Sequence, residues 1–199
     1  MKTVGILLAA GHSRRFGAAD KLLAPYRGKP LVVHAAEALT HAKVDELVAV
    51  VASPDVRACV RHFECVQVTS TDHTQSESLR AGLLRAQALG VTQVVIVLGD
   101  MPLVTPQLIN RVVEVAANTG ISAAFDGQRP MPPACFPQQS FEALKSAEGD
   151  RGASSILRAL PREQLVDVGP DILADVDAPK DLKALPYSQD GCKLAVDQG

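Results

Sequence analysis

The chain alternates short apolar runs with longer stretches in which apolar residues recur every three or four positions. The runs at 3–9, 46–52, 65–70 and 93–100 are rich in β-branched residues. Continuous apolar runs of this length predict strands that are buried on both faces of a sheet.

The amphipathic stretches predict helices, which lie at 30–42, 53–63, 76–89 and 105–120. Residues typical of helix ends support them, because Ser53 precedes a proline and Gly120 closes the last stretch. Strands and helices therefore alternate along the chain. This order predicts parallel strands joined by right-handed helical crossovers, with helices on both faces of the sheet.

The second half of the chain is less regular. It predicts two short strands at 121–127 and 132–137 joined by a hairpin or flap, and a helix–turn–helix over 141–160. Two further short strands, at 166–169 and 172–177, and a last helix at 178–185 complete the pattern. We expect a single domain over 1–185 and a loose tail over 186–199.

Composition narrows the class of protein. Hydrophobic residues make up 47% of the 199 residues, aromatic residues only 4%, and there is no Trp, so the core is built from Ala, Val, Leu and Ile. A net charge of −2 argues against a nucleic-acid or membrane-surface binder. The four cysteines form no C-x-x-C pair, and we expect reduced thiols. The N-terminal apolar run is short and leads into Arg14 and Arg15, unlike a signal peptide, so we expect a cytoplasmic protein.

A small-residue, cationic loop follows the first predicted strand and reads LAAGHSRRFGAADK from Leu8 to Lys21. Its small residues let the backbone approach a ligand, and exposed N–H groups in such a turn bind oxyanions: they are Ala9, Ala10 and Gly11. Its cations supply charge for phosphates: they are Arg14, Arg15 and Lys21. The alternative is a polar loop with solvated arginines.

Asp100 follows the most strand-like run of the chain. An acid at that place is a poor core residue and a good Mg²⁺ ligand, although a turn or helix-cap role is the alternative. Ligands of open α/β sheets bind outside the carboxyl ends of the strands. The cationic loop and Asp100 together therefore indicate a site for a metal-bound nucleotide.

Five motifs in order resemble the molybdenum cofactor cytidylyltransferase branch of the MobA-like NTP transferase superfamily. They are LAAGHSRRFGAADKLL, GDMPLV, SESLRAGL, EGDRGA and DVDAPKDL, and the similarity spans Thr3 to Leu182. The resemblance implies a Rossmann-like three-layer α/β sandwich with a mostly parallel sheet, of the nucleotide-diphospho-sugar transferase type.

The resemblance also implies an activity, the transfer of a cytidylyl group from CTP to the phosphate of molybdopterin. The products would be molybdopterin cytosine dinucleotide and pyrophosphate, and the cofactor Mg²⁺, with Mn²⁺ as a substitute. A xanthine-dehydrogenase-type molybdoenzyme would be the partner. The alternatives are another nucleotide such as GTP, a sugar or alditol phosphate as acceptor, and a non-catalytic protein that delivers nucleotide or cofactor.

Roles follow motif by motif from the resemblance. Arg15 would neutralise the β- and γ-phosphates, and Lys21 would contact the α-phosphate or the acceptor phosphate. Asp100 and Asp150 would hold the metal, with Asp175 and Asp177 as alternatives to Asp150. The residues expected to bind the nucleotide are Leu8, Ala9, Ala10, Gly11, Arg15, Lys21, Ser78, Gly82 and Gly99.

Two stretches of the sequence bear on which base and which acceptor the protein uses. LAAG and RRFG resemble the cytidylyl branch, and the Cβ of Ala10 would crowd a purine more than a pyrimidine. Pro132 and Pro133 stand where relatives usually carry one proline, in a stretch expected to line the acceptor side, which leaves the acceptor open.

Overall fold

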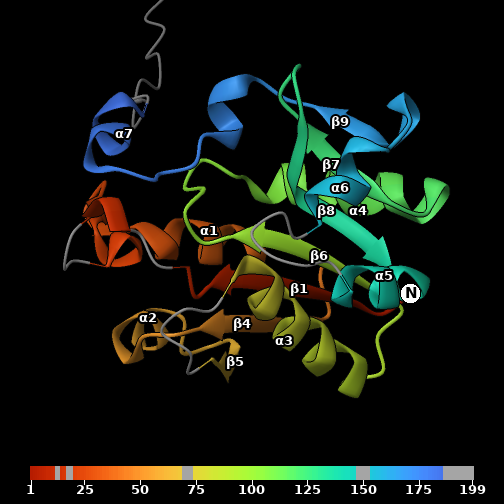
Figure 1. Cartoon of the computed structure of the whole chain (residues 1–199), viewed down its shortest axis with the longest axis horizontal. Coiled ribbons are helices and arrows are strands. Elements are labelled where there is room, and N and C mark those ends of the chain that lie inside the picture. Colours follow the sequence, from red (N-terminus) through yellow and green to blue (C-terminus); the bar gives the residue numbers. More distant parts are fainter. Residues whose placement is uncertain (12–13, 17–19, 69–73, 147–152, 186–199) are drawn as a thin grey trace, which may run out of the picture.

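The structure is a computed structural model that describes residues 1–11, 14–16, 20–68, 74–146 and 153–185. Its centre is a seven-stranded sheet with the order β5–β4–β1–β6–β8–β7–β9 (Figure 1). The strands are β1 (Thr3–Ala9), β4 (Glu46–Val51), β5 (Glu64–Gln67), β6 (Gln93–Leu98), β7 (Ser122–Phe125), β8 (Pro130–Pro137) and β9 (Leu165–Asp167). A separate hairpin, which the sequence pattern did not predict, pairs β2 (Pro25–Tyr26) with β3 (Lys29–Pro30).

The sheet is mostly parallel, as predicted. Strands β5, β4, β1 and β6 run parallel, β8 is antiparallel to both β6 and β7, and β9 is parallel to β7. The strand predicted at 172–177 is wrong, because Pro170–Leu173 forms a 3-10 turn instead. The backbone N–H of Val176 then donates to the carbonyl of Asp100 (3.0 Å), so this segment crosses the end of β6.

Helices cover both faces of the sheet and complete a three-layer sandwich (Figure 1). One core cluster joins the sheet to α1 (Leu31–Thr40), α2 (Pro54–Cys59) and α4 (Pro106–Thr119). The cluster on the other face joins it to α3 (Gln75–Ala88), α5 (Phe141–Lys145) and α6 (Ser154–Arg158). The last helix, α7 (Pro179–Ala184), lies beside the sandwich. None of the described helices is long and apolar enough to cross a membrane.

Strand β1 shows why its sequence is a continuous apolar run. All seven of its residues are buried. Ile6 and Leu8 face the α3 side of the sheet, whereas Leu7 and Ala9 face the α1 side. Successive side chains of a strand point to opposite faces, so a strand covered by helices on both faces needs an apolar residue at every position.

Capping residues explain where the predicted helices begin. Ser53 accepts from the backbone N–H of Asp55 and starts α2. Thr74 and Glu77 form a capping box that starts α3. These side chains satisfy N–H groups that have no partner inside the helix. Helix α2 ends at Cys59, earlier than the predicted 63, because a tight turn over Val60–Phe63 leads into β5.

Candidate active site

Strands β1 and β6 end side by side, and this places the two predicted motifs at one edge of the sheet. The backbone N–H of Gly99 donates to the carbonyl of Leu8 (2.9 Å). A Cβ at Gly99 would lie 3.3 Å from that carbonyl oxygen and 3.3 Å from the Cβ of Ala9. The strand ends approach this closely because residue 99 has no side chain.

Lys21 is the centre of the site. Asp20 caps a short 3-10 turn over Lys21–Leu23 by accepting from the N–H of Leu22 (2.9 Å), and this turn points Lys21 into the sheet edge. Lys21 is only 6% exposed. Its Nζ donates to Asp100 Oδ2 (2.6 Å) and to Asp177 Oδ1 (3.0 Å). The structure therefore brings together residues that lie 79 and 156 positions apart in the chain.

The charges of this cluster depend on one another. Burial alone would lower the pKa of Lys21, but the neighbouring carboxylates of Asp100 and Asp177 outweigh it and raise that pKa. Burial raises the pKa of Asp100, and the negative charge of Asp175 adds to the rise, while Lys21 opposes it. Lys21 is thus a protonated cation that offsets the cost of holding the carboxylate of Asp100 away from water.

Asp100 has capacity for a further partner. Its Oδ1 is buried and has no hydrogen-bond partner among the described residues. A buried oxygen without a partner costs free energy, and such an atom in a functional site indicates a group that binds there. A carboxylate oxygen of this kind fits a divalent cation.

The late motif brings Asp177 to Lys21. Asp181 accepts from the backbone N–H groups of Asp177 (3.0 Å) and Ala178 (2.7 Å) and caps α7. This leaves the carboxylate of Asp177 facing Lys21. The described residues contain no group of three or more His, Cys, Asp and Glu side chains that could hold a metal. Asp150 lies outside the described residues, so its metal-binding role stays a prediction.

Arg15 lies at the rim of the site. Its Nη1 is 3.5 Å from Asp177 Oδ2, and its side chain is 72% exposed. Exposed ion pairs of this length contribute little free energy, so the guanidinium can turn toward a ligand at small cost.

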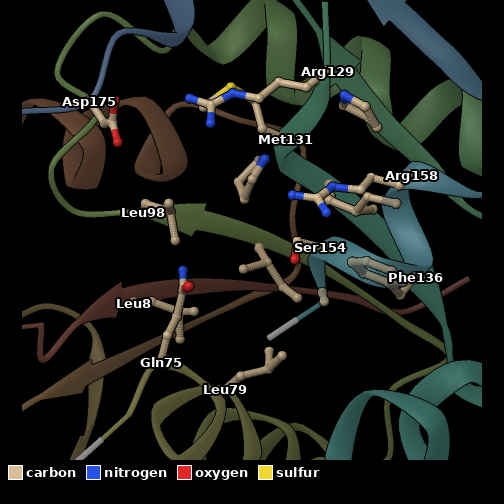
Figure 2. Close-up of a pocket in the computed structure, with 16 residues that line it drawn as sticks. Leu8, Gln75, Leu79, Leu98, Arg129, Met131, Phe136, Ser154, Arg158 and Asp175 are labelled. Atoms are coloured by element: carbon tan, nitrogen blue, oxygen red, sulfur yellow. The ribbon is translucent and has the colours of Figure 1, made fainter. Parts of the chain in front are cut away.

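A cavity of about 180 Å³ opens at the same edge of the sheet, with Asp175 in its wall (Figure 2). Its walls come from the ends of β1 and β6, the first turns of α3, strand β8 and helix α6. The residues that line it are Leu8, Gln75, Leu79, Ile96, Leu98, Arg129, Pro130, Met131, Pro132, Ala134, Phe136, Ala153, Ser154, Leu157, Arg158 and Asp175. Sequence reasoning expected the stretch around Pro132 to line the acceptor side, but it missed Arg129 and Arg158.

Three residues predicted to bind the nucleotide lie in the core. A Cβ at Gly82 would approach Ile6 (2.9 Å) and Val50 (3.1 Å), so this glycine lets α3 pack on β1 and β4. Ser78 is 3% exposed, and its buried Oγ has no hydrogen-bond partner among the described residues. Ala10 is 2% exposed and belongs to the core cluster on the α3 face. Its methyl group is covered by the core in this structure, and the argument that it crowds a purine stays a prediction.

The comparison with protein families agrees with this arrangement, because residues 5–165 match the MobA-like NTP transferase domain. The chain belongs to this family. The membership confirms the superfamily that the sequence motifs resembled. The solved structure of Rv0371c from Mycobacterium tuberculosis superposes with a TM-score of 0.81 at 27% identity, covering 92% of this chain and 96% of that one. A manganese complex of Rv0371c gives a TM-score of 0.79 at 26% identity, covering 94% of this chain and all of that one.

Curated relatives differ in nucleotide and acceptor. A probable molybdenum cofactor guanylyltransferase of Pyrococcus horikoshii is 34% identical over 60% of this chain, and the match spans 59% of that relative. A 3-deoxy-manno-octulosonate cytidylyltransferase of Neisseria gonorrhoeae is 35% identical over 54% of this chain and 43% of its own length. The purine catabolism protein PucB of Bacillus subtilis is 27% identical over 78% of this chain and 80% of its own. The cytidylyl branch therefore stays a prediction.

Proposed function

We propose that the protein transfers a cytidylyl group from CTP to the phosphate of molybdopterin and releases pyrophosphate. The observation that carries the proposal is the cluster of Lys21, Asp100 and Asp177 beside a cavity at the carboxyl ends of β1 and β6. Membership of the MobA-like NTP transferase family supports nucleotidyl transfer as the reaction class.

The chemistry needs positioning and charge more than a strong base. A phosphate monoester is already ionised near neutral pH, so it can attack the α-phosphorus of CTP directly. Repulsion between the two anions is then the main part of the barrier, which bound cations and alignment lower. Lys21 would place its ammonium where negative charge gathers on the α-phosphate, and Arg15 would neutralise the departing pyrophosphate.

Asp100 and Asp177 would hold a divalent cation, Mg²⁺ or Mn²⁺. Asp100 Oδ1, which has no partner among the described residues, and the pairing of both carboxylates with one ammonium fit a cation at this place. Mg²⁺ is typically held by one or two carboxylates together with phosphate oxygens, so two acids suffice. A bound Mg²⁺ supplies Lewis-acid stabilisation of phosphate charge.

Lys21 has two sets of partners in this proposal. In the structure its ammonium lies between the two carboxylates, where a cation would compete with it. Contact with the α-phosphate requires Lys21 to leave at least one carboxylate. We therefore infer that the metal-bound nucleotide replaces Lys21 as the counter-ion of Asp100.

GTP is the second candidate nucleotide, because curated relatives include probable molybdenum cofactor guanylyltransferases. The LAAG and RRFG motifs and the cytidylyltransferase relative support CTP. Delivery of the product to a xanthine-dehydrogenase-type molybdoenzyme remains a prediction.

Pyrophosphate release tests the proposal. The purified protein is incubated with Mg²⁺, molybdopterin and each of CTP, GTP, ATP and UTP. We expect release with CTP that depends on molybdopterin. Release with GTP alone would move the assignment to guanylyl transfer. Release only with a sugar or alditol phosphate would reject molybdopterin as the acceptor. No release with any pair of nucleotide and acceptor would reject nucleotidyl transfer as the activity.

A further inference from the structure

Three consecutive backbone N–H groups fix the late motif at the site. The N–H of Val176 donates to the carbonyl of Asp100 (3.0 Å). The next two N–H groups, those of Asp177 and Ala178, both donate to Asp181 Oδ2, at 3.0 Å and 2.7 Å. The backbone of Asp177 is therefore tied to the end of β6 on one side and to the carboxylate of Asp181 on the other.

Asp181 is itself held in place by α7. Its backbone N–H donates to the carbonyl of Ala178 (2.9 Å), and its carbonyl accepts from the N–H of Leu185 (3.1 Å). Leu185 and Val176 are both buried in a small core cluster that is separate from the two main ones. This cluster anchors α7 beside the sandwich (Figure 1). The carboxylate of Asp181 is thus a fixed acceptor for the late motif.

Asp181 supports the site from outside it. No residue of α7 lines the cavity, and the hydrogen bonds of Asp181 within the described residues go to backbone groups only. The carboxylate of Asp177, by contrast, contacts Lys21 Nζ (3.0 Å) and Arg15 Nη1 (3.5 Å) and is half exposed. Packing alone does not fix a half-exposed side chain, so the anchors of its backbone decide where it lies.

We propose that Asp181 is a positioning residue for the metal site, because its carboxylate holds Asp177 where it shares a divalent cation with Asp100. The inference rests on the proposed function, in which these two acids hold Mg²⁺ or Mn²⁺. Removal of a group that orients a metal ligand commonly weakens metal binding by about 10–100-fold. Asp181 would act through the backbone of Asp177 and would contact neither the cation nor the nucleotide.

Two other roles of the same carboxylate predict different behaviour. A helix cap would stabilise α7 and change the free energy of unfolding alone. A charge near the site would attract a cation from a distance, whatever hydrogen bonds Asp181 accepts. The positioning role differs from both, because it requires an acceptor atom at residue 181 and a carboxylate at residue 177.

Mn²⁺ affinity in the absence of nucleotide tests the proposal and is measured by electron paramagnetic resonance of the free ion. The variants are Asp181→Ala, Asp181→Asn, Asp177→Ala and the double variant Asp177→Ala with Asp181→Ala. Ser53→Ala is the control, because Ser53 also caps a six-residue helix that starts with proline and also accepts from two backbone N–H groups. Urea unfolding of each variant is measured in parallel.

We expect Asp181→Ala to bind Mn²⁺ about tenfold more weakly than the wild type. Asp181→Asn should bind nearly as tightly as the wild type, since its amide oxygen still accepts from both N–H groups. Adding Asp181→Ala to Asp177→Ala should change the affinity little, because the residue through which Asp181 acts is then absent. Ser53→Ala should lower the urea midpoint as Asp181→Ala does, with its Mn²⁺ affinity unchanged.

Three results would overturn the positioning role. An equal loss of affinity in Asp181→Ala and Asp181→Asn would assign the effect to charge. A loss that persists in full when Asp177 is already alanine, or that Ser53→Ala shares, would assign it to general stability. Unchanged affinity in Asp181→Ala, including no Mn²⁺ binding by the wild type, would leave Asp181 as a helix cap alone.

These measurements use no turnover, so they separate the positioning role from the proposed function. If no pair of nucleotide and acceptor releases pyrophosphate but the affinities follow the expected pattern, nucleotidyl transfer fails and the role of Asp181 stands. If pyrophosphate is released but Asp181→Ala binds Mn²⁺ as the wild type does, the transfer stands and the role of Asp181 fails.

Discussion

Lys21 holds the site together and also competes with the cation that the proposed reaction needs. Its ammonium contacts carboxylate oxygens from the end of β6 and from the late motif. The carboxylate of Asp100 is largely buried, whereas that of Asp177 is half exposed. A buried carboxylate without a counter-ion would be costly, so the lysine stabilises Asp100 most. The same contacts make its removal a direct test of where the cation binds.

Lys21→Met should increase the affinity for Mn²⁺ in the absence of nucleotide by about tenfold, because the ammonium no longer competes for Asp100 and Asp177. Electron paramagnetic resonance of free Mn²⁺ measures this affinity without any turnover. The variant should at the same time lose most transfer activity, since the α-phosphate loses its cation. Unchanged or weaker Mn²⁺ binding would place the metal away from these carboxylates.

Asp100→Asn should lower kcat by at least about a hundredfold, because the amide is a poor ligand for a divalent cation. Circular dichroism should show an intact fold, since Asp177 still pairs with Lys21. Asp171→Asn, at an exposed residue of the 3-10 turn before the late motif, is the matched control and should keep wild-type activity. An active Asp100→Asn enzyme would reject the metal assignment.

The turn between β7 and β8 is the element that carries Arg129. Backbone N–H groups of Arg129 and Gln128 lower the pKa of Asp126, so its carboxylate is preferred in the folded state. A carboxyl whose folded pKa is depressed stabilises the protein above its unfolded pKa, and this contribution is lost as the pH falls through the folded pKa. The turn should therefore weaken in acid.

Asp126→Ala should lower the free energy of unfolding by about 1–2 kcal/mol near pH 7, through the loss of two hydrogen bonds. Urea titrations at about pH 7 and about pH 3 should show the difference from wild type shrinking in acid. A constant difference at both pH values would contradict the role of the Asp126 carboxylate.

Helix α3 packs on the sheet through Gly82. An added methyl group would press on Ile6 and Val50, two branched side chains held within the core. Overpacking of this kind lowers the free energy of unfolding by about 1–3 kcal/mol, while the better helix propensity of alanine raises it by about 1 kcal/mol.

Gly82→Ala should therefore lower the free energy of unfolding by about 1 kcal/mol and leave the KM for CTP unchanged. Urea unfolding and initial-rate kinetics measure the two quantities. Arg80→Ala, on the exposed side of the same helix, should change neither the free energy of unfolding nor the KM for CTP appreciably. A rise in the KM for CTP with unchanged stability would restore Gly82 to the nucleotide site.

Across the whole molecule, sequence patterns predicted the strands and helices whose signals lie close together in the chain. The continuous apolar run of β1, the Ser53 cap of α2 and the apolar spacing of α3 predicted their elements because each signal lies within a few residues. Lys21 and Asp100 were recognised from motifs at two strand ends, and the parallel sheet brings them together.

Other features depend on contacts between distant segments. Asp177 reaches Lys21 because the segment around Val176 crosses the end of β6, a path that no local periodicity encodes. Ala10 and Gly82 resembled ligand contacts in the sequence, yet both are packed in the core. Arg129 and Arg158 come from a hairpin and a helix whose sequence gave no sign that they share a cavity.

The most direct test of cytidylyl transfer follows the nucleotide itself. CTP labelled at the α-phosphorus is incubated with the protein, Mg²⁺ and molybdopterin, and the products are separated by chromatography. We expect the label to move into a molybdopterin cytosine dinucleotide in equal amount to the pyrophosphate released, and Asp100→Asn to abolish both. Label that remains in CTP, or appears only as free CMP, would contradict transfer to the acceptor phosphate.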